Sequence, residues 1–199
     1  MRLGRLEISG GAMAALALLY YLDDRGVTLW VLLGCLLHEL GHWTAIRLLG
    51  GRVVRMRVSC AGAELRLSAA RPLPPWALLL AALAGPGANL LAAWVSVGLS
   101  RRGAGLYFFA GLNLGLACFN LLPAGWLDGG KALEALLAQM GREETGRRLT
   151  ELGSDVTAGL LLAAGVVLLW QSGGRNFTLL IAGLWMTAAA RRERRAAVL

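Results

Sequence analysis

Two histidines and a glutamate stand at a spacing that suits hydrolytic metal chemistry. The run His38-Glu39-Leu40-Gly41-His42 has the pattern HExxH. On a helix, residues four apart lie on one face, so both imidazoles can reach one zinc ion while Glu39 stands beside the water that the ion activates. Zinc lowers the pKa of such a water toward neutrality and polarises a peptide carbonyl, so no covalent nucleophile is needed. The motif predicts His38 and His42 as metal ligands and Glu39 as the general base.

A third ligand has to come from elsewhere, because catalytic zinc sites usually offer three protein ligands and this sequence has two histidines. Carboxylates and thiols remain, and Asp128 is the strongest candidate. Pro123 and Gly125 interrupt the end of an apolar stretch before it, and Gly129 and its neighbouring glycine open the backbone after it, so the carboxylate can turn inward. The alternative is that Asp128 caps a helix or a turn.

Composition places these residues in a membrane. The chain is 57% hydrophobic and 16% charged, with a mean hydropathy of +0.59, which is far from the average of soluble proteins. A membrane-spanning helix needs about 20 apolar residues. Six candidate spans can be read along the sequence: 10–22, 27–49, 75–99, 104–122, 155–171 and 176–190. The HExxH run lies inside the second, where a charged side chain costs about 2.5–3.5 kcal/mol to insert and is therefore expected to mark function.

The basic residues follow the same layout. With six spans, sixteen of the 20 Lys and Arg residues fall on one side of the membrane, so we expect both termini in the cytoplasm and the protein in a bacterial cytoplasmic membrane. These residues form short clusters without interleaved aromatics, which argues against nucleic-acid binding. On this topology the HExxH run and Asp128 share one depth, nearer the cytoplasmic face.

Two segments are not expected to cross. Residues 51–70 alternate polar and apolar side chains around Gly62, which predicts a β-hairpin at the membrane surface. Residues 131–152 are charged with leucines at helical spacing, which predicts an amphipathic cytoplasmic helical segment. The expected fold is an all-α polytopic membrane protein of about six transmembrane helices with a short surface hairpin. It forms a single domain, 1–199, with a catalytic core at 27–130 and C-terminal helices at 131–199.

Three motifs in this order resemble the site-2 protease family of intramembrane metalloproteases, peptidase family M50. They are the HExxH run, the pattern Asn-x-x-Pro-x-x-x-Leu-Asp-Gly from Asn120 to Gly129, and Ala84-Gly85-Pro86-Gly87-Ala88-Asn89, which is similar to the family's Gly-Pro-x-x-Asn segment. The resemblance covers residues 27–130. The six-span layout with an early HExxH is most similar to the subgroup that includes the sporulation protease processing a pro-sigma factor, here without a CBS or PDZ domain.

The resemblance implies one Zn²⁺ per chain, bound by His38, His42 and Asp128, with Glu39 activating water. It also implies that Asn120 and Asn89 hold substrate or the developing oxyanion. The implied activity is regulated intramembrane proteolysis of a membrane protein or membrane-associated peptide near the cytoplasmic face. The lipid bilayer and a separate regulatory membrane protein are the other expected partners. A non-proteolytic metal-binding protein or an inactive regulatory homologue is the alternative.

Weaker signals have simpler interpretations. Asn89 and Asn120 could hydrogen-bond between helices without touching substrate. Cys35, three residues before His38, could offer a thiolate to the metal, but a small buried hydrophobe is the simpler reading. Gly111 and Gly115 form a GxxxG pattern, which in a six-span bundle indicates close packing within the chain more often than dimerisation.

Overall fold

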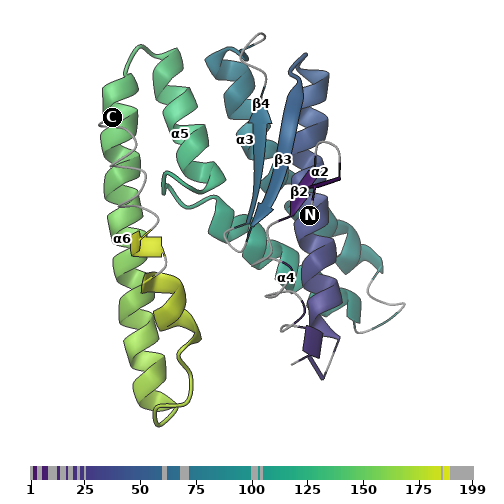
Figure 1. Ribbon diagram of the computed structural model, residues 1–199, viewed down its shortest axis with the longest axis vertical. Coiled ribbons are helices and arrows are strands. Elements are labelled where there is room, and N and C mark those ends of the chain that lie inside the picture. Colours follow the sequence, from purple (N-terminus) through teal and green to yellow (C-terminus); the bar gives the residue numbers. More distant parts are fainter. Residues whose placement is uncertain are drawn as a thin grey trace. The chain divides into compact units, whose positions relative to one another are not determined.

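The computed structural model describes residues 2–3, 6–8, 13, 17, 20–21, 23–24, 26–59, 62–67, 72–99, 103, 105–184 and 186–188. The chain forms two compact units, Met1–Phe119 and Asn120–Leu199. Figure 1 shows the elements of each, coloured along the sequence. The boundary between the units falls inside the segment 27–130, which the sequence suggested as one catalytic core.

The first unit is built on three helices: α2 (Val27–Leu48), α3 (Pro75–Leu99) and α4 (Gly105–Asn120), whose last residue lies beyond the unit's boundary. Helix α2 begins where Asp23 caps it, since the Asp23 carboxylate accepts hydrogen bonds from the backbone N–H groups of Val27 (2.9 Å) and Thr28 (2.5 Å). Helices α2 and α3 pack against each other. Their buried faces repeat every fourth residue, as helical geometry requires: Gly34, His38, His42 and Ile46 on α2, and Ala77, Ala81, Gly85, Asn89 and Ala93 on α3.

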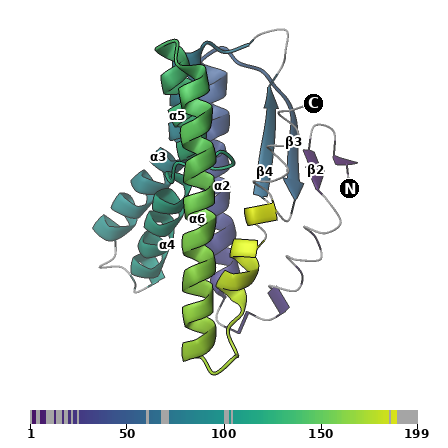
Figure 2. The ribbon, with the colours of Figure 1, turned by 90° about the vertical axis from the view of Figure 1, so that its left-hand side faces the viewer.

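A four-stranded sheet belongs to the same unit, in the order β1 (Arg2–Leu3), β2 (Leu6–Ile8), β3 (Val53–Ser59), β4 (Gly62–Leu67). Strands β3 and β4 pair antiparallel within the segment 51–70 and lie side by side in Figure 2, and β3 contacts α2. Strand β2 adds to β3 in parallel, and β1 pairs antiparallel with β2. The sequence did not predict β1 and β2, because strands of two and three residues are too short to show an alternating pattern.

The second unit contains α5 (Asp128–Gln139) and α6 (Glu143–Gln171), joined by a tight turn in which Gly141 has φ 68°. The two helices pack side by side (Figure 1). The segment 131–152 is therefore helical, but it is divided between α5 and the beginning of α6. The expected fifth span, 155–171, is the apolar second half of α6, which begins at Glu143 with a charged first half.

A shorter helix, Thr178–Ala188, returns along α6. Gly165 makes the close contact possible, since a Cβ there would lie 2.6 Å from the backbone nitrogen of Leu180. Gly183 does the same from the other side, where a Cβ would lie 2.9 Å from a methyl of Leu162. Small residues at such crossings are typical of helix pairs in membranes.

Three helices, α2, α3 and α6, are long and apolar enough to cross a membrane, while α4 and Thr178–Ala188 are apolar but shorter. The predicted spans at 27–49 and 75–99 coincide with α2 and α3, and 155–171 lies within α6. The span at 10–22 falls largely outside the described residues, so six spans remain a prediction. Many large apolar side chains face outward on these helices, among them Leu29, Leu36, Trp94 and Leu160, as lipid-facing positions require.

Candidate metal centre

The two histidines of the HExxH run lie together on the buried face of α2. His38 is 8% exposed and His42 is 9% exposed. Their rings meet edge to face, with centroids 4.7 Å apart, and the two Nε2 atoms are separated by 3.1 Å. The spacing of four residues therefore brings one nitrogen of each ring to the same point in space.

Helix α3 binds the other nitrogen of each ring. Nδ1 of His42 lies 2.7 Å from the backbone oxygen of Ala81, and Nδ1 of His38 lies 2.6 Å from Oδ1 of Asn89. A carbonyl oxygen can only accept, so Nδ1 of His42 carries the hydrogen. Nearby, Pro86 has no N–H to give to the carbonyl four residues earlier, which loosens the hydrogen bonding of α3 next to Ala81.

The protonation of these rings leaves a pair of acceptors facing each other. A neutral imidazole has one N–H, so with Nδ1 protonated both Nε2 atoms present lone pairs at 3.1 Å. Two lone pairs at that distance repel unless a cation lies between them. Two Zn–N bonds of about 2.05 Å at a tetrahedral angle place their nitrogens about 3.3 Å apart. The donor chemistry of the pair fits a zinc ion.

A gap in α3 keeps the space beside these nitrogens open. Gly85 faces both rings, and a Cβ there would lie 2.6 Å from Cε1 of His42 and 2.8 Å from Nε2 of His38, with Nε2 of His42 nearer still. Any side chain at position 85 would therefore fill the space next to the ligating atoms. The absence of a Cβ is therefore required for the two rings to lie against α3 as they do.

Glu39 stands on α2 between the two histidines in sequence and is half-buried. Successive helical residues are about 100° apart around the axis, so Glu39 lies beside the histidine face and not on it. That placement suits a group that acts next to a metal without binding it. The sequence prediction assigned it this role.

Asp128 belongs to the second unit, where it is the first residue of α5 and only 5% exposed. Lys131, one turn later, is mostly exposed and reaches one carboxylate oxygen at 3.3 Å. The helix N-terminus and this ammonium both favour the ionised carboxylate. A buried, ionised carboxylate is a ligand that divalent metals accept.

The glycines after Asp128 allow the beginning of α5 to lie against the loop before it. A Cβ at Gly129 would lie 2.6 Å from the backbone oxygen of Leu122 and closer still to that of Leu121. A Cβ at Gly130 would lie 2.9 Å from the backbone nitrogen of Gly125 and would overlap the backbone oxygen of Ala124. These contacts position Asp128, so the two glycines are required by packing.

Helix α6 also contacts the loop that precedes Asp128. Ser154 accepts a hydrogen bond from the backbone N–H of Gly125 at 3.0 Å and donates its own hydroxyl to the backbone oxygen of Thr150 at 2.7 Å. A Cβ at Gly153 would overlap the backbone oxygen of Pro123. The loop from Leu121 to Leu127 is thus held by α5 and α6 together.

Asn89, a candidate for holding substrate or the oxyanion, hydrogen-bonds between helices. Its amide nitrogen lies 3.1 Å from the backbone oxygen of Gly34 and 2.7 Å from Oδ1 of Asn113, so both of its N–H groups point to protein acceptors. Asn120 is half-buried at the end of α4. Nothing in the described structure tests a substrate role for Asn120, which stays a prediction.

Two simpler readings of the sequence are corrected. Cys35 is exposed on α2 while both histidines are buried, so it is not the small buried hydrophobe that was expected. Within the part of the chain that the structure describes, a Cβ at Gly111 or Gly115 would meet no atom within 4 Å, so no close packing of this GxxxG pattern is seen there. Conversely, sequence reasoning missed Asn113 between these two glycines, because a lone asparagine in an apolar span gives no direction.

Comparisons with known proteins agree with this site. The family model described as peptidase family M50 matches residues 100–164, which contain Asn120 and Asp128. A curated relative, the "Putative zinc metalloprotease Rip3" of Mycobacterium tuberculosis, is 29% identical over 203 residues, covering 89% of this chain. The match covers 48% of that relative, so this chain spans about half its length.

A solved structure shares the fold. The site-2 protease from Methanocaldococcus jannaschii superposes with a TM-score of 0.71, covering 97% of this chain and 93% of that chain at 20% identity. The family, the fold and the apolar helices together make the chain an integral membrane protein. The motif order, the paired histidines and the matches to a family model, a curated zinc metalloprotease and a solved fold all agree, and the chain is similar to the site-2 proteases of peptidase family M50.

Proposed function

We propose that this chain is an intramembrane zinc endopeptidase that cuts membrane-associated or transmembrane substrate segments near the cytoplasmic face. The observation that carries the proposal is the pair of buried imidazoles on α2. Their Nε2 lone pairs converge to 3.1 Å, while both Nδ1 atoms are occupied by acceptors on α3. This arrangement is suited to a divalent metal inside an apolar helix pair.

Asp128 is proposed as the third ligand. His38, His42 and Asp128 are each buried, and each offers a ligand atom of a kind that zinc accepts. Two histidines and one carboxylate leave a fourth position open, which is the arrangement of catalytic zinc sites and not of closed structural ones. When bound, zinc polarises the scissile carbonyl and lowers the pKa of the attacking water.

The chain's own residues then move the protons. Glu39 takes a proton from the water as its oxygen bonds to the carbonyl carbon, and it returns that proton to the amine nitrogen as the C–N bond breaks. Asn89 and Ala81 hold the two rings in the orientation that keeps Nε2 unprotonated. The second candidate function, a metal-binding protein without proteolysis, would not need a carboxylate at position 39.

Substrate presentation is the remaining requirement. A helical segment hides its amides in backbone hydrogen bonds, so it has to unwind locally before hydrolysis. Strand β4 ends the order of the described sheet and has β3 on one side. We propose that an unwound substrate segment adds to this edge as an extended strand, which would keep its backbone groups bonded.

The decisive experiment uses the full chain in proteoliposomes with a single-span membrane substrate. Glu39→Gln should bind zinc with the wild-type stoichiometry of one ion per chain and should lose cleavage by about 10²-fold or more, because the base is gone while the ligands stay. Glu143→Gln, at the exposed first turn of α6, is the control and should cleave normally. Wild-type cleavage by Glu39→Gln would contradict the assigned base.

Substrate identity can be addressed in cells. Membrane proteomes from cells with the wild-type chain are compared with those from cells with Glu39→Gln. An uncut membrane protein that accumulates in the variant is the expected result. If the wild-type chain binds zinc but the membrane proteomes of the two kinds of cell are the same, the metal-binding alternative is favoured.

A further inference from the structure

We propose that Asn113 on α4 is a positioning residue for the metal centre, acting on His38 through Asn89. This inference rests on the proposed zinc site and adds a residue from a third helix to it. Both asparagines are 0% exposed. They lie within the first unit together with the histidines.

The direction of every hydrogen bond in this group follows from two backbone carbonyls. The amide nitrogen of Asn113 lies 2.9 Å from the backbone oxygen of Phe109, which can only accept. Oδ1 of Asn113 therefore faces Asn89 and accepts from its amide nitrogen at 2.7 Å. The other N–H of Asn89 goes to the backbone oxygen of Gly34 at 3.1 Å.

The orientation of Asn89 is thereby determined. With its nitrogen bound to Gly34 and Asn113, its oxygen must face His38, where the distance to Nδ1 is 2.6 Å. An amide oxygen only accepts, so Nδ1 of His38 must carry the hydrogen and Nε2 must carry the lone pair. The relay thus selects the tautomer of His38 that can bind a metal.

Removal of Asn113 would loosen this selection. With one acceptor gone, the Asn89 amide would lose a partner that holds its nitrogen away from His38, and a flipped amide would present N–H groups to Nδ1. His38 would then carry its hydrogen on Nε2 and could not bind the ion. A buried hydrogen bond between amide groups in a membrane helix bundle is a firm constraint, because lipid offers no replacement partner.

Helices α2 and α4 are in close contact at Gly34, and this contact places Asn113 near Asn89. A Cβ at Gly34 would lie 2.9 Å from a methyl of Leu112, 3.1 Å from one of Leu116 and 3.5 Å from Oδ1 of Asn113. The glycine at position 34 therefore allows α4 to bring Asn113 close to α2 at the point where Asn89 binds the backbone oxygen of Gly34.

The test measures Zn²⁺ affinity of the full chain by competition with a chelator, without any substrate. Loss of a group that orients a metal-bound histidine typically weakens metal binding about 10–100-fold, which is the result expected for Asn89→Leu. Asn113→Leu should weaken binding several-fold. Asn113→Asp should restore most of it, since a protonated carboxyl offers the same donor and acceptor as the amide.

Two further measurements separate positioning from mere stability. The double variant Asn89→Leu/Asn113→Leu should bind zinc no more weakly than Asn89→Leu alone, because Asn113 acts through Asn89. The absorption spectrum of the Co²⁺-loaded protein should change in Asn113→Leu and return in Asn113→Asp. Ser96→Ala, buried seven residues beyond Asn89 on the same face of α3, is the matched control and should leave affinity and spectrum unchanged.

The outcomes distinguish the two proposals. If the wild-type chain binds no zinc, the proposed function fails. The positioning role alone is overturned if the wild type binds zinc and Asn113→Leu binds it equally well, if the losses of the two single variants multiply in the double variant, or if Ser96→Ala is as damaging.

Discussion

Gly85 on α3 lies directly against His42 on α2 and leaves no room for a methyl group. A Cβ at position 85 would approach Cε1 of the His42 ring to 2.6 Å, well inside the distance that two carbon atoms tolerate. The glycine belongs to the Gly-Pro-x-x-Asn segment. A glycine is required at position 85 for a steric reason, because the ring nitrogens of His38 and His42 occupy the space that a side chain would take.

Gly85→Ala should therefore weaken zinc binding strongly. Overpacking of a tight site costs about 1–3 kcal/mol, which corresponds to about 5–150-fold in the zinc dissociation constant. Gly87→Ala is the matched control on the same helix, because a Cβ there would meet no atom within 4 Å. Chelator competition on both variants checks the prediction, and equal affinities would show that the space beside the histidines is not needed.

Asp128→Ala should remove most of the bound zinc, because a site with two histidines lacks the third ligand that catalytic centres use. Elemental analysis of the purified protein measures the metal content. Asp155→Ala, at an exposed position on α6, is the control and should keep one zinc per chain. If Asp128→Ala retained full zinc, Asp128 would be a helix-terminal residue and the third ligand would have to be sought elsewhere.

Zinc removal should lower the thermal stability of the full chain in detergent. A ligand that binds the folded state stabilises it by about 2.7 kcal/mol at a free concentration 100 times its dissociation constant. Melting curves with and without a strong chelator, followed by zinc titration, measure this difference. A Tm that does not respond to zinc in the wild type would mean that the histidine pair does not bind the ion.

Gly153→Ala should disturb the loop before Asp128, because a Cβ there would overlap the backbone oxygen of Pro123. We expect a loss of stability of about 1–3 kcal/mol together with weaker zinc binding. Gly159→Ala on the same helix is the control, since a Cβ there meets nothing within 4 Å. Comparable stability and zinc affinity of the two variants would mean that the packing of α6 does not position the loop.

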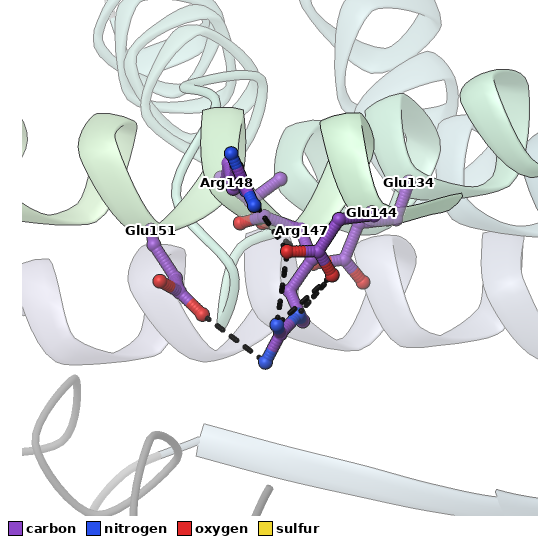
Figure 3. A network of polar contacts seen from close by, with 6 residues as sticks. Glu134, Glu144, Arg147, Arg148 and Glu151 are labelled. Atoms are coloured by element: carbon purple, nitrogen blue, oxygen red, sulfur yellow. Dashed lines mark hydrogen bonds and ion pairs between the residues drawn. The ribbon is translucent and has the colours of Figure 1, made fainter. Parts of the chain in front are cut away.

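The polar start of α6 offers a contrast between exposed and buried contacts (Figure 3). Glu144 pairs with Arg147 at 2.9 Å and with Arg148 at 2.9 Å, all at the exposed surface. Thr150 is 1% exposed, and its hydroxyl lies 2.6 Å from Oε1 of Glu134 on α5. The ion pairs of Glu144 lie within α6, whereas the hydrogen bond between Thr150 and Glu134 joins α6 to α5.

Thr150→Val should therefore destabilise the chain by about 1–2 kcal/mol, because it leaves a partly buried carboxylate oxygen without its donor. Glu144→Gln should cause no measurable change, since water and salt screen exposed pairs. Chemical denaturation of the two variants measures both effects. A larger loss for Glu144→Gln than for Thr150→Val would reverse this ranking.

Residue spacing alone was sufficient to predict that His38 and His42 lie together. Four residues separate His38 from His42, and a helix necessarily puts residues at that separation on one face. The apolar lengths likewise placed α2 and α3 within a residue or so of their observed bounds, because a segment that crosses lipid must satisfy its backbone internally. The glycines around Asp128 pointed to a backbone that turns sharply there.

Only the tertiary structure decided which atoms of these residues are hydrogen-bonded to one another. Asn89 was a candidate for substrate binding, and it is the contact of α3 with both α2 and α4 that directs its oxygen to His38 and its nitrogen to Gly34 and Asn113. Likewise, Gly85 is needed because His42 lies opposite it. Sequence periodicity gives the face on which a residue lies, whereas the partner across that face depends on how helices pack, which is a property of distant segments brought together.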